Sequence, residues 1–141
     1  MKLLKSFFNY HFLLLAGKIR IRCIRNNSEE IINDSGHLFL QVSVPQNEIL
    51  THKTKLNISF RVNKLSLFQR SILPVLSTPF YAGFRGFISK KFYICRESNI
   101  LRGHYEWEKT EDINNYITSA AMKFMRIISI PGSLNYEIKE N

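Results

Sequence analysis

The sequence predicts an α+β protein with one antiparallel sheet and its helices on a single face of that sheet. Two observations lead to this class. From residue 55 onward, segments with the period of two that is typical of half-buried strands alternate with segments of helical period. In addition, the chain has 141 residues, 45% of them hydrophobic, which is enough material for one core and too little length for two ordinary domains.

The first fifty residues are predicted to form a basic N-terminal extension, with a helix and one or two extra strands, that packs on a core domain spanning residues 51–141. The predicted helix carries an apolar stripe of Leu4, Phe8, Phe12 and Leu15. We expect this stripe to face the core, with an interfacial membrane helix as the alternative. Residues 18–25 and 37–44 alternate as strands, and we expect the two strands to form a hairpin.

The core domain begins with its clearest strand, at residues 56–62, followed by a helix at 67–77 that Ser66 caps and Pro74 kinks or ends. A long aromatic strand up to Cys95 and a strand at 100–107 then run antiparallel to each other.

Thr110 is predicted to cap a second helix, with Glu111 and Asp112 in its first turn, and this helix is predicted to continue to residue 128. Its apolar stripe consists of Ile113, Tyr116, Ile117, Ala120, Ala121, Phe124, Ile127 and Ile128. A strand at 134–138 closes the domain. The order strand, helix, strand, strand, helix, strand is the βαββαβ pattern of ferredoxin-like domains.

Aromatic residues are expected on both faces of this sheet. The residues predicted to face the helices are Phe84, Ile88, Leu101, Tyr105 and Trp107. Phe87, Tyr93 and His104 would then lie on the opposite face. A sheet with apolar residues on both faces needs a cover on each face, so we expect residues 1–50 or a second copy of the chain to cover this one.

Charge and cysteine content limit the classes of function. The formal net charge of +9 predicts a basic surface that attracts nucleic acid, anionic lipid or an acidic partner. Cys23 and Cys95 form no CxxC pair, and the four histidines are scattered, so we expect a reducing, cytoplasmic setting and no metal site built by the protein. The N-terminal apolar segment is too short and too polar to span a bilayer.

Three runs of sequence resemble the dimeric α+β barrel superfamily, in particular small monooxygenases of the antibiotic-biosynthesis type. They are "GFRGFISKKFYI", "GHYEWEKTEDINNYITSAAMKF" and "PGSLNYEI", and the resemblance covers residues 55–139. It implies a homodimer in which two sheets pack face to face. It also implies a small hydrophobic or aromatic ligand in the cleft between each sheet and its helices.

The haem-degrading members of this superfamily use an Asn, a Trp and a His. The corresponding positions in this chain are Asn57, Tyr116 and Arg126. Without an imidazole on that helix no iron ligand is evident, so haem breakdown is not expected. The resemblance therefore implies oxygenation without a cofactor, in which the protein supplies binding and a proton acceptor.

His104 and Tyr105 are the candidate catalytic residues, and Glu106 is close enough to orient His104. The candidate substrate-binding residues are Asn57, Arg85, Tyr93, Trp107, Tyr116, Met122 and Met125. A histidine at a subunit interface, core aromatic residues and packing methionines explain the same positions without any function.

Two non-enzymatic classes remain as alternatives. An open sheet face with aromatic residues is also the plan of RNA-recognition domains, and residues 85–94 weakly echo their "K/R-G-F/Y-G/A-F-V" motif. A membrane-peripheral role would use the basic N-terminus. Salt-dependent binding to nucleic acid or to anionic vesicles would separate both classes from an enclosed ligand site.

Overall fold

The computed structural model describes residues 2–23, 37–46, 52–63, 77–95 and 98–140. The strands within these ranges are β1 Arg20–Cys23, β2 His37–Ser43, β3 Thr54–Arg61, β4 Phe87–Cys95, β5 Ile100–Trp107 and β6 Asn135–Glu140. The helices are α1 Lys2–Leu15, α3 Pro79–Ala82, α4 Thr110–Ile117 and α5 Ala120–Ile128. Apart from Ser77, the helix that the sequence predicts at 67–77 lies outside the described residues.

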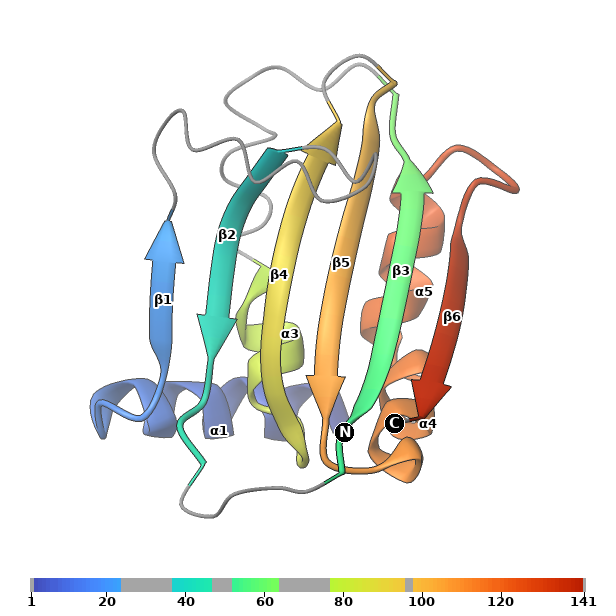
Figure 1. Ribbon diagram of the computed structural model, residues 1–141. Coiled ribbons are helices and arrows are strands. Elements are labelled where there is room, and N and C mark those ends of the chain that lie inside the picture. Colours follow the sequence, from blue (N-terminus) through green and yellow to red (C-terminus); the bar gives the residue numbers. More distant parts are fainter. Residues whose placement is uncertain (1, 24–36, 47–51, 64–76, 96–97, 141) are drawn as a thin grey trace.

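The six strands form one antiparallel sheet in the order β1-β2-β4-β5-β3-β6. All four helices lie behind this sheet in Figure 1, so its front face carries no described helix. The α+β class that the sequence predicts is therefore confirmed. The predicted pairing of the two N-terminal strands is also confirmed, and β2 continues the sheet by pairing with β4.

Buried side chains alternate with more exposed ones along β3 and β5, and the buried set forms the face of the sheet that the helices cover. In β5 every second residue is buried, and in β3 Leu56, Ile58 and Phe60 are buried while the residues between them are not. Residues directly opposite in an antiparallel pair share one face, and the buried side chains of both strands share a core with Ile113, Tyr116 and Met122 of the helices, so they point toward the helices. These side chains form the core together with Trp107, which is fully buried.

A β-bulge near the start of β4 changes which aromatic residues face the helices. Phe87 lies opposite Trp107 and Ser89 lies opposite Glu106, so Ile88 is an extra residue in β4. Phe87 therefore faces the helices, where its ring packs 5.4 Å from the ring of Tyr81. The prediction that Phe87 lies on the opposite face is wrong, because one extra residue reverses the alternation.

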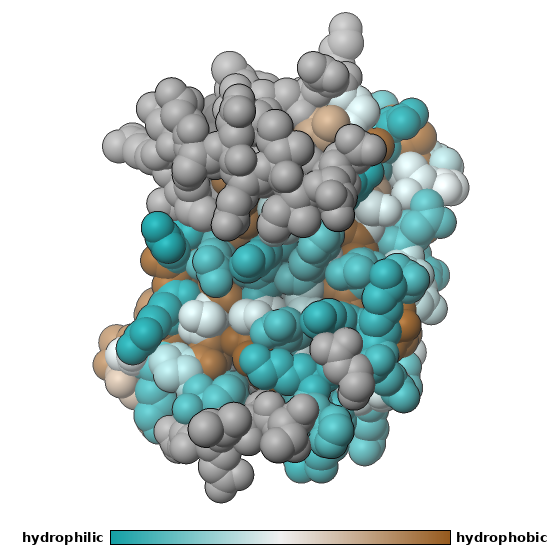
Figure 2. All heavy atoms as spheres, in the orientation of Figure 1, coloured by the Kyte–Doolittle hydropathy of each residue, from teal (hydrophilic) through white to brown (hydrophobic). Residues whose placement is uncertain are grey.

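The front face of the sheet is mostly polar, in contrast to the aromatic face that we expected. Tyr93 and His104 do lie there, with ring centroids 4.9 Å apart. The other side chains on this face of β3 to β6 include Lys55, Asn57, Ser59, Lys91, Arg102, Glu106, Glu137 and Lys139. Figure 2 shows hydrophilic residues across most of the visible sheet face between the regions of uncertain placement.

The single helix that the sequence predicts at 110–128 is two helices, α4 and α5. The chain leaves the helical conformation at Ser119, where ψ is 166°. The hydroxyl of Thr118 donates a hydrogen bond to the carbonyl oxygen of Asn114, a local interaction that competes with continuation of the helix. The break changes which residues are buried: Met122 is buried, whereas Ile127 is 79% exposed and Phe124 is 52% exposed.

Helix α1 packs on α3 through polar side chains. Ser6 Oγ donates a hydrogen bond to the carbonyl oxygen of Pro79 (3.0 Å), and Asn9 Nδ2 donates one to that of Gly83 (2.8 Å). Gly83 lies against the backbone of Ser6, so there is no room for a Cβ atom at this position. The predicted stripe of Leu4, Phe8, Phe12 and Leu15 is exposed. The prediction that this stripe faces the core is therefore wrong.

Helix α1 is also too short to cross a bilayer. No helix in the described part of the chain is long and apolar enough to span a membrane.

Candidate ligand-binding site

A cavity of about 400 Å³ lies between the sheet and the helices. Strands β3, β4 and β5 line it with Phe60, Lys90, Phe92, Leu101 and Tyr105. The residues on the helical side are Ser77, Phe80, Tyr81, Tyr116, Ala120, Ala121, Phe124, Met125 and Ile128. Apart from one lysine and a few hydroxyl groups, the walls are apolar, which is the usual composition of a small-molecule site.

Small residues keep this space open. Ala120 and Ala121 begin α5 on the helical side, and Gly103 lies in the middle of β5. A Cβ atom on Gly103 would lie 2.7 Å from Cε2 of Tyr105 and 3.2 Å from Cε of Lys90. The glycine therefore allows the Tyr105 ring and the Lys90 side chain to lie across this strand.

Lys90 is the charged residue of the cavity. It lies opposite Tyr105 of β5 on one side and Val42 of β2 on the other, and its side chain is buried. The ammonium nitrogen Nζ lies 4.1 Å from the ring centroid of Tyr81, 4.6 Å from that of Tyr105 and 5.2 Å from that of Phe92. Lys90 makes no ion pair with any residue that the structure describes.

Burial lowers the pKa of Lys90 to about 7. The ammonium and the neutral amine are therefore both populated at neutral pH. The faces of the three aromatic rings stabilise the ammonium form in part.

Three tyrosines line the cavity together with this lysine, and their hydroxyl groups are paired. Tyr105 and Tyr116 share a hydrogen bond of 3.3 Å between their hydroxyl oxygens, and the hydroxyl of Tyr81 lies 3.2 Å from Thr78 Oγ1. Burial raises the pKa of Tyr116 to about 12 and raises the pKa of Tyr81 and Tyr105 as well. All three hydroxyls are therefore protonated at neutral pH, so they can act as donors.

Three of the residues predicted from the sequence line the cavity: Tyr105, Tyr116 and Met125. Trp107 and Met122 are buried in the core beside it. The Trp107 ring centroid lies 5.4 Å from that of Tyr116, and its indole N–H has no hydrogen-bond partner in the described part of the chain.

The other predicted residues lie elsewhere. His104, Asn57 and Tyr93 are on the front face of the sheet, because successive residues of a strand point to opposite sides. Arg85 is exposed in a groove between α1 and α4. The structure therefore separates His104 from Tyr105, and the predicted residues do not form a single site.

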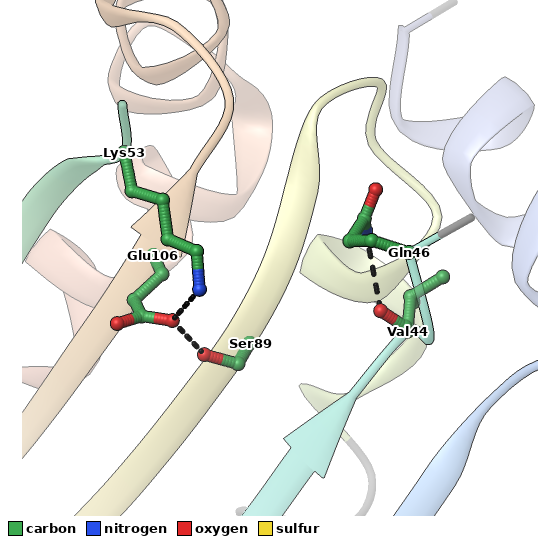
Figure 3. Close-up of polar contacts among 5 residues, drawn as sticks. All are labelled: Val44, Gln46, Lys53, Ser89 and Glu106. Carbon is green, nitrogen blue, oxygen red and sulfur yellow. Dashed lines mark hydrogen bonds and ion pairs between the residues drawn. The ribbon is translucent and has the colours of Figure 1, made fainter. Parts of the chain in front are cut away.

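Among the residues that the structure describes, no carboxylate forms an ion pair with His104, although a catalytic histidine usually has such a partner. Burial lowers the pKa of His104, and the positive charges of Arg102, Lys91 and Lys139 lower it further, so the ring is neutral at pH 7. Glu106, which we expected to orient His104, instead accepts a hydrogen bond from Ser89 Oγ (3.1 Å) and pairs with Lys53 (3.5 Å), as Figure 3 shows.

Lys90, Tyr81 and Phe92 were not predicted as site residues. A signal for Lys90 is present in the sequence of β4, "FISKKFYIC". Lys90 shares the period-two face of Phe92 and Ile94, so it is a charged residue on an otherwise apolar face. The described residues contain no group of three His, Cys, Asp or Glu side chains that could hold a metal ion.

Fold and cavity together define an α+β protein with a six-stranded antiparallel sheet and an apolar cavity beneath its helices. No family model and no curated protein matches the chain. Among solved structures, the chain is similar to the crystal structure of protein SO0527 from Shewanella oneidensis, with 12% sequence identity and a TM-score of 0.49. The similarity covers 67% of this chain and 95% of that chain, and no functional conclusion follows from it.

Proposed function

We propose that the protein binds a small, mostly apolar molecule in the cavity between the sheet and its helices. The observation that carries the proposal is the cavity itself. Its volume of about 400 Å³ lies within the range of small-molecule sites, and its walls are mainly aromatic and aliphatic. A ligand of this kind would replace water against these walls, and the apolar area removed from water would favour binding.

We also propose a ferredoxin-like arrangement for β3 to β6 and the helices between them. The strand order β4-β5-β3-β6, with all neighbouring strands antiparallel, supports this topology. The sequence resemblance to dimeric α+β barrels implies a ligand in the same place, between sheet and helices.

A further part of this proposal, which rests on the sequence resemblance, is cofactor-free oxygenation of the bound molecule, in which molecular oxygen is the oxidant and the substrate itself supplies the electrons. Such a reaction needs a proton acceptor near the substrate. His104 lies on the other side of the sheet, so it cannot serve the cavity. The neutral amine of Lys90 lines the cavity and can accept a proton from a neutral substrate, whereas a ligand that brings a carboxylate would keep Lys90 protonated.

The binding proposal is tested with the neutral fluorescent probe N-phenyl-1-naphthylamine. We expect saturable binding with one site per chain and a blue shift of its emission, because the probe leaves water for an apolar site. The substitution Ala121→Phe places a ring in the cavity and should abolish this binding. Ala16→Phe adds the same ring at an exposed position and is the matched control. Equal binding by both variants would refute the proposal.

A second candidate function is attachment to an anionic membrane surface, and the exposed side of α1 favours it. Leu4, Phe8, Phe12 and Leu15 project from one side of this helix and are 60 to 89% exposed. The exposed basic residues Lys5, Lys18 and Arg20 lie in the same part of the chain. Apolar side chains with flanking basic residues are typical of helices that lie in the interface of an anionic bilayer.

A further inference from the structure

Lys90 presents a positive charge to an apolar cavity, and the described residues provide no negative charge for it. We propose that the ligand is a small organic acid, with an apolar body in the cavity and a carboxylate that pairs with Lys90 Nζ. This inference rests on the proposed function, because it names the class of ligand that the same cavity binds.

The sheet holds the Lys90 side chain inside the protein. β4 is paired along both edges, with β2 and with β5, so the strand cannot turn over without losing both sets of backbone hydrogen bonds. A slip of one residue would bury Lys91 and expose Phe92. The stem of Lys90 is also confined between Gly103 and the rings of Tyr81 and Tyr105. The amine therefore has no route to solvent on the front face.

The groups around Lys90 Nζ stabilise the ammonium charge only in part. An ammonium group has three N–H donors, whereas a ring face attracts the cation but offers no lone pair. The acidic side chains Glu106 of β5 and Asp112 of α4 lie elsewhere: Glu106 is on the front face with Lys53, and Asp112 lies against Gly86. A buried cation without a charged acceptor is unfavourable, so a ligand that brings a carboxylate supplies the charge-assisted hydrogen bond that Nζ lacks.

The tyrosine hydroxyls add donors for the same head group. Tyr105 and Tyr116 both line the cavity. In the hydrogen bond between them, one hydroxyl group donates its proton to the other. The proton of the accepting hydroxyl group remains available for an acceptor in the cavity. A carboxylate has two oxygens, so it can accept from the ammonium and from a hydroxyl at once. A single positive charge also matches a monoanion, whereas a phosphate dianion would leave one buried charge uncompensated.

The test compares naphthalene-2-carboxylate with naphthalene-2-carboxamide, which has nearly the same shape and no charge. Binding is measured by isothermal titration calorimetry at pH 6.5. We expect the wild-type protein to bind the acid about tenfold more tightly than the amide, or better, because hydrogen bonds to charged groups are the stronger ones. Lys90→Met should remove this preference and keep the binding of the amide, which also shows that the variant is folded. Lys91→Met, on the same strand but on the front face, should behave as the wild type does.

The dependence of acid binding on pH provides a second measurement. The titratable side chains that face Lys90 are Tyr81 of α3, Tyr105 of β5 and Tyr116 of α4, and their raised pKa values keep them neutral below pH 9. The affinity of the wild type for the acid should therefore fall between pH 6.5 and 9, as Lys90 loses its proton. The affinity for the amide should stay constant.

Each outcome separates this inference from the proposed function. If the wild type binds acid and amide equally, or if Lys90→Met keeps the preference for the acid, the inference is wrong and the apolar site stands. If neither naphthalene compound binds while N-phenyl-1-naphthylamine does, the inference is again wrong. If none of the three compounds binds, the proposed function fails as well.

Discussion

At the scale of single residues, position 90 holds a lysine where the alternation of β4 places an apolar side chain. Burial makes the cationic form of Lys90 unfavourable, and the pKa of Lys90 is lowered for this reason. Residues that lower stability in this way are common at functional sites. The neighbouring Gly103 belongs to the same arrangement, because any larger side chain would displace Lys90 or Tyr105.

We expect Lys90→Met to raise the free energy of unfolding, and to raise it most at and below pH 7. The pKa of Lys90 is about 7 in the folded protein, whereas the ordinary pKa of a lysine side chain, 10.5, applies to the unfolded chain. Between these values the unfolded chain binds a proton that the folded protein does not, so wild-type stability rises with pH. The difference between variant and wild type should therefore shrink by about 1.4 kcal/mol per pH unit between pH 7.5 and 9.5.

Urea unfolding at a series of pH values measures this difference. The series stays below pH 10, because above it the unfolded tyrosines ionise while the buried Tyr81, Tyr105 and Tyr116 resist ionisation, which lowers stability. Lys91→Met is the control and should show no such trend relative to the wild type. A Lys90→Met variant that is no more stable than the wild type at pH 6.5 would show that Lys90 is not buried as a cation.

At the scale of secondary-structure elements, α1 exposes its apolar side and packs through Ser6, Asn9 and Tyr10. Helices of water-soluble domains usually have the reverse arrangement, with the apolar side toward the core. Exposed apolar faces are often found at interaction sites, which is why we propose membrane attachment through α1.

We expect the protein to co-sediment with vesicles that contain phosphatidylglycerol, and to do so less at high salt, because the basic residues around α1 attract the anionic surface. The double substitution Phe8→Ser and Phe12→Ser should abolish the binding. Ile127→Ser removes an even more exposed apolar side chain from α5 and should have no effect.

Other results of the same assay would argue against a membrane role for α1. Equal sedimentation of the double variant and the wild type would do so directly. Salt-dependent binding to single-stranded RNA, unchanged by the double substitution, would instead favour the front face of the sheet as an RNA site.

At the scale of the whole molecule, the homodimer that the sequence resemblance implies remains a prediction. The front face of the sheet is the surface on which two copies would meet. Basic side chains on it include Lys55, Lys91, Arg102 and Lys139, against the acidic Glu106 and Glu137. Two such faces would repel each other, so a dimer formed through them should be favoured by salt, which screens the repulsion.

Native mass spectrometry reports the number of 16.6 kDa chains and any retained ligand in one measurement. We expect a dimer, and an added mass on each chain that is lost after denaturation and extraction. Size-exclusion chromatography at low and high salt should show the dimer fraction rising with ionic strength. A monomer at all protein and salt concentrations would contradict the dimer, without bearing on the cavity.

Features that depend on local periodicity can be predicted from the order of the residues alone. The alternation of Leu56, Ile58 and Phe60 predicts β3, the alternation in residues 100–107 predicts β5, and the acidic residues after Thr110 predict the start of α4. Side chains spaced by two in a strand must share a face, so such patterns can be read without knowledge of the rest of the chain. Tyr105, Tyr116 and Met125 followed from these patterns and the resemblance, and they line the cavity.

Features that depend on contacts between elements could not be predicted from local periodicity. The bulge at Ile88 turns Phe87 inward because of its pairing with β5, and the break before Ser119 buries Met122 and leaves Ile127 exposed. The burial of Lys90 likewise depends on which face of β4 the helices cover. A periodic pattern shows which residues lie together, but the partners across the sheet decide which of them leave water.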